Sequence, residues 1–125
     1  MDKRAISAGL LAAGPYSPAV EAGHFVFCSG QIPFNAQTGE LVTSDIEAAT
    51  EQVLKNLRAV LAAAGLDLTH VVKTTVFLTN MGDFAAMNKA YGRFFVESHP
   101  ARSAVAVAAL PRGAMVEIEA IALRP

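Results

Sequence analysis

The sequence predicts an α+β domain in which a mixed sheet carries two helices on one face. One long and one shorter stretch have helical periodicity, and β-branched or alternating stretches surround them. A length of 125 residues fits a single domain spanning 1–125. The chain is 53% hydrophobic and only 17% charged, more apolar material than one small core easily uses. We therefore expect an apolar sheet face that suits a partner copy, although an alanine-rich core is the simpler explanation.

The part of the chain before the first helix predicts short strands and turns. Residues 14–18 contain two prolines, so they form a rigid extended or turning segment. Residues 24–29 predict a strand, with Phe25 and Phe27 on the same face because side chains alternate along a strand. Residues 35–40 predict a turn centred on a Thr-Gly pair.

Two stretches predict helices that cover one face of the sheet. Residues 45–64 have a 3.6-residue apolar stripe. Ser44 and Glu47 have the spacing of a capping box, and Gly65 stands where a C-terminal cap glycine belongs. A second helix begins at Asp83. Its apolar face consists of Phe84, Met87, Tyr91, Phe94 and Phe95.

Three further strands complete the predicted sheet. The β-branched residues 71–78 lie between the two helices. Residues 103–109 and 115–123 finish the chain. The tight Leu-Pro-Arg-Gly link at 110–113 predicts that these last two strands form a hairpin.

Charge, cysteine and histidine content weigh against several classes of function. The formal net charge is −1 and the ten Lys and Arg residues are scattered, so neither nucleic acid nor a membrane surface is an expected partner. The one cysteine, Cys28, fits a buried position in a cytoplasmic protein. The three histidines are isolated, and we expect no metal site. Residues 3–13 imitate a signal peptide only faintly.

Three charged residues near the end of the chain are the strongest candidates for chemistry. Arg102 lies just after a proline and before small apolar residues, and its planar guanidinium suits a carboxylate. Glu117 and Glu119 are two residues apart in a predicted strand, so they point the same way. One of them could be a general acid or base with a shifted pKa. A salt bridge for Arg102 and a solvated sheet face for the glutamates are the plainer alternatives.

Two polar residues are further candidates. Asn88 lies on the aromatic stripe of the second helix, where a polar side chain needs partners. Ser29 shares a strand face with two phenylalanines and precedes Gly30. Each could belong to a site, but hydrogen bonding to local backbone is an equally simple role for Ser29 and a simpler one for Asn88.

The order of motifs along nearly the whole chain resembles the reactive-intermediate deaminase (Rid/YjgF) family. The closing block is the most specific of these motifs. They are GPYSPAV at 14–20, SGQIP at 29–33, TGE at 38–40, VKTTVFL at 72–78, DFAAMN at 83–88, PARS at 100–103 and VEIEAIA at 116–122.

The resemblance implies a fold, an assembly and an activity. Members of this family have a chorismate-mutase-like α+β domain and form homotrimers with ligand clefts between neighbouring subunits. They hydrolyse enamine and imine intermediates, such as 2-aminoacrylate and 2-iminopropanoate, to a 2-keto acid and ammonia. The resemblance therefore implies a 2-iminobutanoate/2-iminopropanoate deaminase whose partner is a small 2-imino or enamino acid. It implies no metal or organic cofactor.

The same resemblance assigns roles by motif position. Arg102 is expected to bind the substrate carboxylate, and Glu117 to orient or deprotonate the attacking water. Glu119 is left as structural. The other substrate-binding residues implied are Tyr16, Ser29, Gly30 and Asn88.

Two departures from the family pattern bear on substrate preference. Ala104 stands where many relatives have a cysteine, and the segment 96–99 is shorter than in archetypal members. These departures keep open a deaminase dedicated to a bulkier enamine acid. Further alternatives are a non-catalytic binder of small carboxylates and an endoribonuclease-type translation inhibitor.

Overall fold

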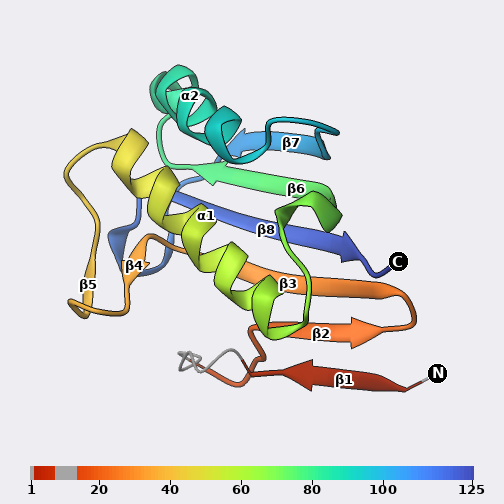
Figure 1. The fold of residues 1–125 in the computed structure, drawn as a ribbon. Coiled ribbons are helices and arrows are strands. Elements are labelled where there is room, and N and C mark those ends of the chain that lie inside the picture. Colours follow the sequence, from red (N-terminus) through yellow and green to blue (C-terminus); the bar gives the residue numbers. More distant parts are fainter. Residues whose placement is uncertain (1, 8–13) are drawn as a thin grey trace.

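A computed structural model describes residues 2–7 and 14–125. Within these residues, five strands precede the first α-helix, and the second α-helix lies between two of the three remaining strands (Figure 1). Three short 3-10 turns (η1–η3) lie in the connections of this described part. In chain order the elements are β1 (Lys3–Ile6), β2 (Ala19–Ala22), β3 (Phe25–Gln31), β4 (Phe34–Asn35), β5 (Glu40–Leu41), α1 (Ile46–Ala63), η1 (Leu68–His70), β6 (Val71–Leu78), η2 (Met81–Asp83), α2 (Phe84–Phe94), β7 (Ala101–Ala106), η3 (Pro111–Gly113) and β8 (Val116–Leu123).

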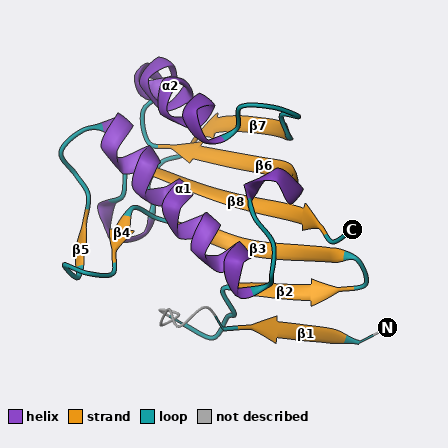
Figure 2. Ribbon diagram, in the orientation of Figure 1, coloured by secondary structure: helices purple, strands orange, loops and turns teal. Residues whose placement is uncertain are grey.

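The main sheet has six strands in the order β1-β2-β3-β8-β6-β7. Only the β6–β7 pair is parallel, because α2 carries the chain back between these two strands. Both helices lie on one face of the sheet, and the small β4–β5 hairpin lies beside α1, where Asn56 donates to Phe34 O at 2.9 Å (Figure 2). The predicted α+β class, the mixed sheet and the placement of both helices are confirmed.

The predicted hairpin between the last two strands is wrong. β8 lies between β3 and β6, whereas β7 pairs only with β6, at the edge of the sheet. The connection between them passes the end of β6, where the Val107 amide donates to Leu78 O and the Thr79 amide donates to Met115 O. The Leu-Pro-Arg-Gly link is therefore part of a crossover that includes η3.

The N-terminal strands extend the sheet further than the sequence indicated. β1 and β2 form an antiparallel pair, and β2 pairs with β3. The predicted strand at 24–29 is longer in the structure and contains an irregularity between Cys28 and Gln31. Residues 8–13, which belong to the apolar N-terminal stretch, lie outside the described residues.

Helix α1 begins one residue later than the predicted capping box. Asp45 is the N-cap, and its carboxylate accepts from the Ala48 amide at 2.7 Å. Glu47 instead pairs with Arg93 of α2 at 2.8 Å, which joins the two helices. Gly65 ends the helix as predicted: it has a φ of +75°, which favours glycine, in a Schellman motif.

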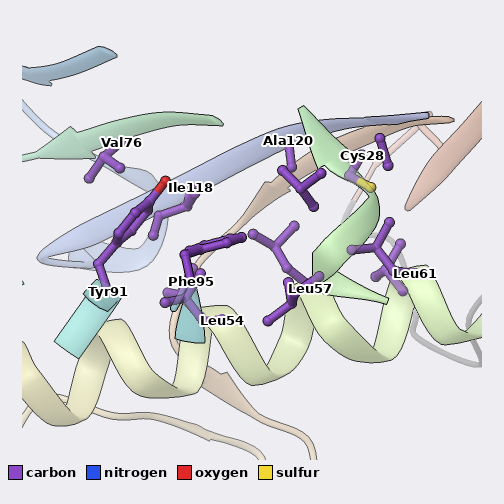
Figure 3. Packing of buried hydrophobic residues seen from close by; sticks show 14 of the residues in the cluster. Cys28, Leu54, Leu57, Leu61, Val76, Tyr91, Phe95, Ile118 and Ala120 are labelled. Carbon is purple, nitrogen blue, oxygen red and sulfur yellow. The ribbon is translucent and has the colours of Figure 1, made fainter. Parts of the chain in front are cut away.

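The hydrophobic core lies between the helices and one face of the sheet, as Figure 3 shows. Strand alternation places Val26 and Cys28 of β3 in this core and leaves Phe25 and Phe27 on the opposite, outer face. Phe27 is 46% exposed in the single chain. None of the helices in the described part of the chain has the length and apolar character to cross a membrane.

Candidate functional site

Both glutamates of the closing block point to the outer face of the sheet. Alternation along β8 buries Val116 and Ile118 and turns Glu117 and Glu119 away from the core. Glu117 is half-buried and Glu119 is exposed. Burial raises the pKa of Glu117, and the nearby charge of Glu119 raises it further. Glu117 therefore holds a proton more readily than an ordinary glutamate does.

Gly30 makes room for the Glu117 side chain. A Cβ atom on Gly30 would lie 2.8 Å from Cδ of Glu117 and 3.0 Å from its Cγ, and closer still to Oε2. The ladder between β3 and β8 is irregular between Cys28 and Gln31, which is where the carboxylate lies over the backbone. Only glycine accommodates the carboxylate in this position.

Ser29 ties the GPYSP segment to β3. Its hydroxyl donates to Ser17 O at 2.6 Å, and its amide donates to Pro18 O at 2.9 Å. The hydroxyl therefore has the backbone role that the sequence left open. Tyr16 lies in the same segment, with its side chain 53% exposed. Ser29 and Gly30 place this segment near Glu117, and we call these residues (Tyr16, Ser29, Gly30 and Glu117) the carboxylate group.

Arg102 lies on the other face of the sheet, toward α2. Its Nη1 donates to Asn88 Oδ1 at 2.7 Å. Its guanidinium carbon lies 4.8 Å from the centre of the Tyr91 ring and 5.5 Å from that of Phe84. Asn88, Phe84 and Tyr91 all belong to α2, so one helix holds the cation. We call Arg102 and Asn88, with these two rings, the arginine group.

Strand register separates the two groups within one chain. Glu117 pairs with Phe77 of β6, and Arg102 pairs with Thr74 of the same strand. Two strand spacings of ~4.8 Å and three residues of ~3.3 Å place the Cα atoms of Glu117 and Arg102 roughly 14 Å apart, with side chains on opposite faces. One chain therefore does not bring the predicted residues into a single site.

Sequence reasoning did not assign a site role to Phe84, Tyr91 or Thr74. The two aromatic residues were assigned only to the apolar face of the second helix. Tyr91 is buried, and its hydroxyl makes a 2.7 Å hydrogen bond with the Thr74 hydroxyl. Burial raises the pKa of Tyr91, although Thr74 and Arg102 act in the opposite direction. The one available signal was the spacing from Asn88, which places Phe84 and Tyr91 on its helix face.

A shallow hollow of about 180 Å³ lies elsewhere on the outer face, beside Glu119. Lys73, Thr75, Phe27 and Ile121 also line it. The Lys73 amine donates to Thr74 O at 2.9 Å. The hollow includes neither Glu117 nor Arg102. Across residues 2–7 and 14–125, no cluster of three or more His, Cys, Asp and Glu residues could hold a metal ion.

The geometry gives two separate groups, each with chemistry that a small-molecule site can use. Arg102 has a guanidinium that Asn88 and the Tyr91 ring hold in one place, and guanidinium groups are suited to carboxylates. Glu117 offers a half-buried carboxylate that can accept a proton. The structure is thus a small α+β protein with a buttressed arginine at the sheet edge and a separate half-buried glutamate on the outer face.

One family model and three known proteins match this chain. A family model described as Endoribonuclease L-PSP matches residues 6–124. Protein DfrA of Myxococcus xanthus is 56% identical over 114 residues, covering 90% of this chain and 87% of that protein. The 2-iminobutanoate/2-iminopropanoate deaminase of Mus musculus is 49% identical over 113 residues, covering 90% and 84%. The E. coli TdcF structure with bound serine has a TM-score of 0.87 and 44% identity, covering 98% and 94%. The chain belongs to the Rid/YjgF family.

Proposed function

We propose that this protein hydrolyses small 2-imino and enamino acids to 2-keto acids and ammonia. The observation that carries the proposal is Arg102, held by Asn88 at 2.7 Å and set against two aromatic rings. Family membership supports imine and enamine deamination, and the mouse relative is named for this activity. The substrates expected are of the 2-iminopropanoate and 2-iminobutanoate type, in the cytoplasm.

The proposed site forms between copies of the chain. The arginine group of one copy faces the carboxylate group of the next copy in a homotrimer. Two features support this arrangement: the groups lie on opposite faces of one sheet, and the outer face exposes Phe25, Phe27 and Leu123. Exposed apolar patches of this kind mark association surfaces. Each chain would contribute one half to each of two clefts.

The proposed reaction needs a clamp, a water molecule and one base. Arg102 binds the substrate carboxylate through charge-assisted hydrogen bonds. An enamino acid first becomes the imine, losing a proton from its nitrogen to water and gaining one from water at C3. Glu117 takes a proton from the attacking water as the water oxygen bonds to the imine carbon, and passes that proton to the nitrogen. It then takes the remaining hydroxyl proton as the C–N bond breaks, and passes it to the departing ammonia. The C=O of the 2-keto acid remains, and Glu117 is regenerated as a carboxylate.

The experiment generates 2-aminoacrylate with a serine dehydratase and traps the remaining imine with semicarbazide. We expect the wild-type protein to lower the semicarbazone signal, and Arg102→Ala to lose about 100-fold of this effect because the substrate is no longer oriented. Arg58→Ala is the matched control, since Arg58 also lies over an aromatic ring, that of Phe94 at 5.4 Å. An unchanged signal with the wild-type protein, or full activity in Arg102→Ala, would contradict the proposal.

The same assay separates the remaining alternatives. A series of imines with longer side chains tests a dedicated deaminase, which would prefer a bulkier substrate over 2-iminopropanoate. The family model is described as an endoribonuclease, so RNA is incubated in parallel. The formal net charge of −1 gives no basis for strong phosphate binding. RNA cleavage that is lost in Glu117→Gln, without any effect on the imine, would replace the proposed reaction.

A further inference from the structure

The arginine group contains a tyrosine that makes two different kinds of contact. The face of the Tyr91 ring lies 4.8 Å from the guanidinium carbon of Arg102. The hydroxyl of the same ring makes a 2.7 Å hydrogen bond with Thr74 Oγ1, and the Thr74 side chain is fully buried. Figure 3 shows the hydroxyl directed from α2 toward the sheet.

The strand register explains why one ring can make both contacts. Thr74 of β6 and Arg102 of β7 are Cα partners in the parallel pair, so their side chains lie side by side on the helix-facing side. Tyr91 spans both: its hydroxyl is fixed on Thr74 while its ring covers Arg102. Phe95 packs against the ring, with centroids 4.7 Å apart. The ring is therefore held from three directions.

We propose that Tyr91 is a positioning residue, which Thr74 anchors and which holds the Arg102 guanidinium in the orientation that binds a ligand carboxylate. The inference rests on the proposed function, since it deepens the role of Arg102 in it. Arginine has a long side chain with much rotamer freedom, and β7 is an edge strand. Stacking on a desolvated ring and the hydrogen bond to Asn88 together remove that freedom before the ligand arrives.

The alternative is that the Tyr91–Thr74 pair only stabilises the fold. A buried hydroxyl that loses its partner destabilises the folded state, whereas loss of both partners is nearly neutral. This difference allows the two roles to be separated. The variants are Tyr91→Phe, Thr74→Val, their double combination, and Tyr91→Leu, which removes the ring face. Val60→Ala, a core truncation in α1 away from Arg102, is the control for stability.

Two measurements are made on each variant in its native oligomeric state. Thermal unfolding gives the Tm, and titration with pyruvate, followed by NMR, gives the affinity for a 2-keto acid. Turnover of 2-iminopropanoate and of its amide, which lacks the carboxylate, gives KM and kcat. We expect Tyr91→Leu to weaken pyruvate binding about five- to tenfold and to raise KM for the acid similarly. Turnover of the amide should remain within about twofold of the wild type.

The double variant decides between the roles. If Tyr91 positions Arg102, Tyr91→Phe/Thr74→Val regains the Tm of the wild type but retains weak pyruvate binding, because the ring has lost its anchor. The proposal would be overturned if the double variant regained both the wild-type Tm and wild-type pyruvate affinity. It would also be overturned if Val60→Ala weakened pyruvate binding as much as the Tyr91 variants do. The pyruvate titration is independent of turnover. If the wild-type protein has no deaminase activity but the Tyr91 variants bind pyruvate weakly, the inference is supported and the proposed function is rejected. If the Tyr91 variants bind pyruvate normally and the protein is an active deaminase, the inference is rejected and the proposed function stands.

Discussion

The side chain of Glu117, the proposed base, lies directly over the backbone of Gly30. A methyl group on Gly30 would lie 2.8 Å from Cδ of Glu117, so the carboxylate has to move. We expect Gly30→Ala to lower kcat about 10- to 100-fold, because small displacements of a catalytic group are costly. The semicarbazide assay measures this loss.

A second glycine provides the control for Gly30→Ala. Gly92 lies within α2, and a methyl group there would meet no atom within 4 Å. Gly92→Ala should keep full activity and gain up to about 1 kcal/mol of stability, since alanine favours the helix. Full activity in Gly30→Ala would show that the position of Glu117 does not matter for turnover.

The raised pKa of Glu117 predicts how activity depends on pH. The base form exists only above this pKa, so kcat/KM should fall as the pH drops through a value higher than that of an exposed glutamate. Glu119→Gln removes a negative charge that raises the pKa of Glu117. The acid limb of the pH profile should therefore move to lower pH in Glu119→Gln. The control is Glu51→Gln on α1, whose carboxylate pairs with Lys55 and Arg93 rather than lying near Glu117, and it should leave the limb in place. An unmoved limb in both variants would count against Glu117 as the base.

At the scale of elements, Glu21 joins three parts of the chain. Its carboxylate pairs with Arg4 of β1 and with Arg124 after β8, each at 2.7 Å. Arg124 also donates to Ala64 O at the end of α1, at 2.7 Å. The hydrogen bonds from Arg4 and then Arg124 hold the pKa of Glu21 below its usual value. One carboxylate thus ties the N-terminal strand and the C-terminus to the long helix.

The lowered pKa of Glu21 predicts a loss of stability in acid. Its folded-state pKa lies below the unfolded value, so the stabilisation is complete above the unfolded value and disappears as the pH falls through the folded value. We expect Glu21→Gln to have a lower Tm at pH 7 and a flatter dependence of Tm on pH between pH 5 and pH 3. Thermal scans across this range test it, with exposed Glu40→Gln as control. Parallel Tm curves for wild type and Glu21→Gln would reject the role of this carboxylate.

Local patterns in the sequence predicted where individual helices and strands lie along the chain better than they predicted which strands pair with each other. The β-branched stretch 71–78 coincides with β6, and the predicted long helix differs from α1 by one residue at each end. The predicted capping box with Ser44 is wrong because Asp45, the next residue, is the N-cap, and its side chain accepts the hydrogen bond from the Ala48 amide. The predicted hairpin is wrong because the turn residues at 110–113 do not determine that β6 lies between β7 and β8. That order depends on non-local pairing of β8 with β3 and β6.

The candidate site was predictable only in part, for a related reason. Alternation along one strand placed Glu117 and Glu119 on the same face, as the structure has them. It could not tell which of them is half-buried, because burial comes from β3 and Gly30. Nor could it reveal that Arg102 lies on the other face, since the two strands are two positions apart in the sheet. The roles of the six predicted site residues remain predictions.

For the whole molecule, the separation of the arginine group from the carboxylate group within one chain leads us to expect an oligomer. If Arg102 and Glu117 act in one site, as proposed, their positions on opposite faces mean that a second copy has to complete that site. The exposed Phe25 and Phe27 provide a surface for that copy. A closed ring of identical chains would repeat the same cleft at every interface.

A shared cleft predicts that two inactive variants restore each other. Arg102→Ala keeps the carboxylate group and Glu117→Gln keeps the arginine group, so a mixed oligomer contains some clefts with both groups intact. Random mixing of equal amounts, by unfolding and refolding together, should recover about a quarter of wild-type activity, since each half is intact in half of the chains. Refolding each variant alone should recover about a hundredth of wild-type activity or less. The double variant mixed equally with wild type should give about a quarter, below the half expected if each wild-type chain were active by itself. Light scattering reports the oligomeric state of each sample. Absence of recovery in mixed oligomers would mean that Arg102 and Glu117 do not act in the same cleft.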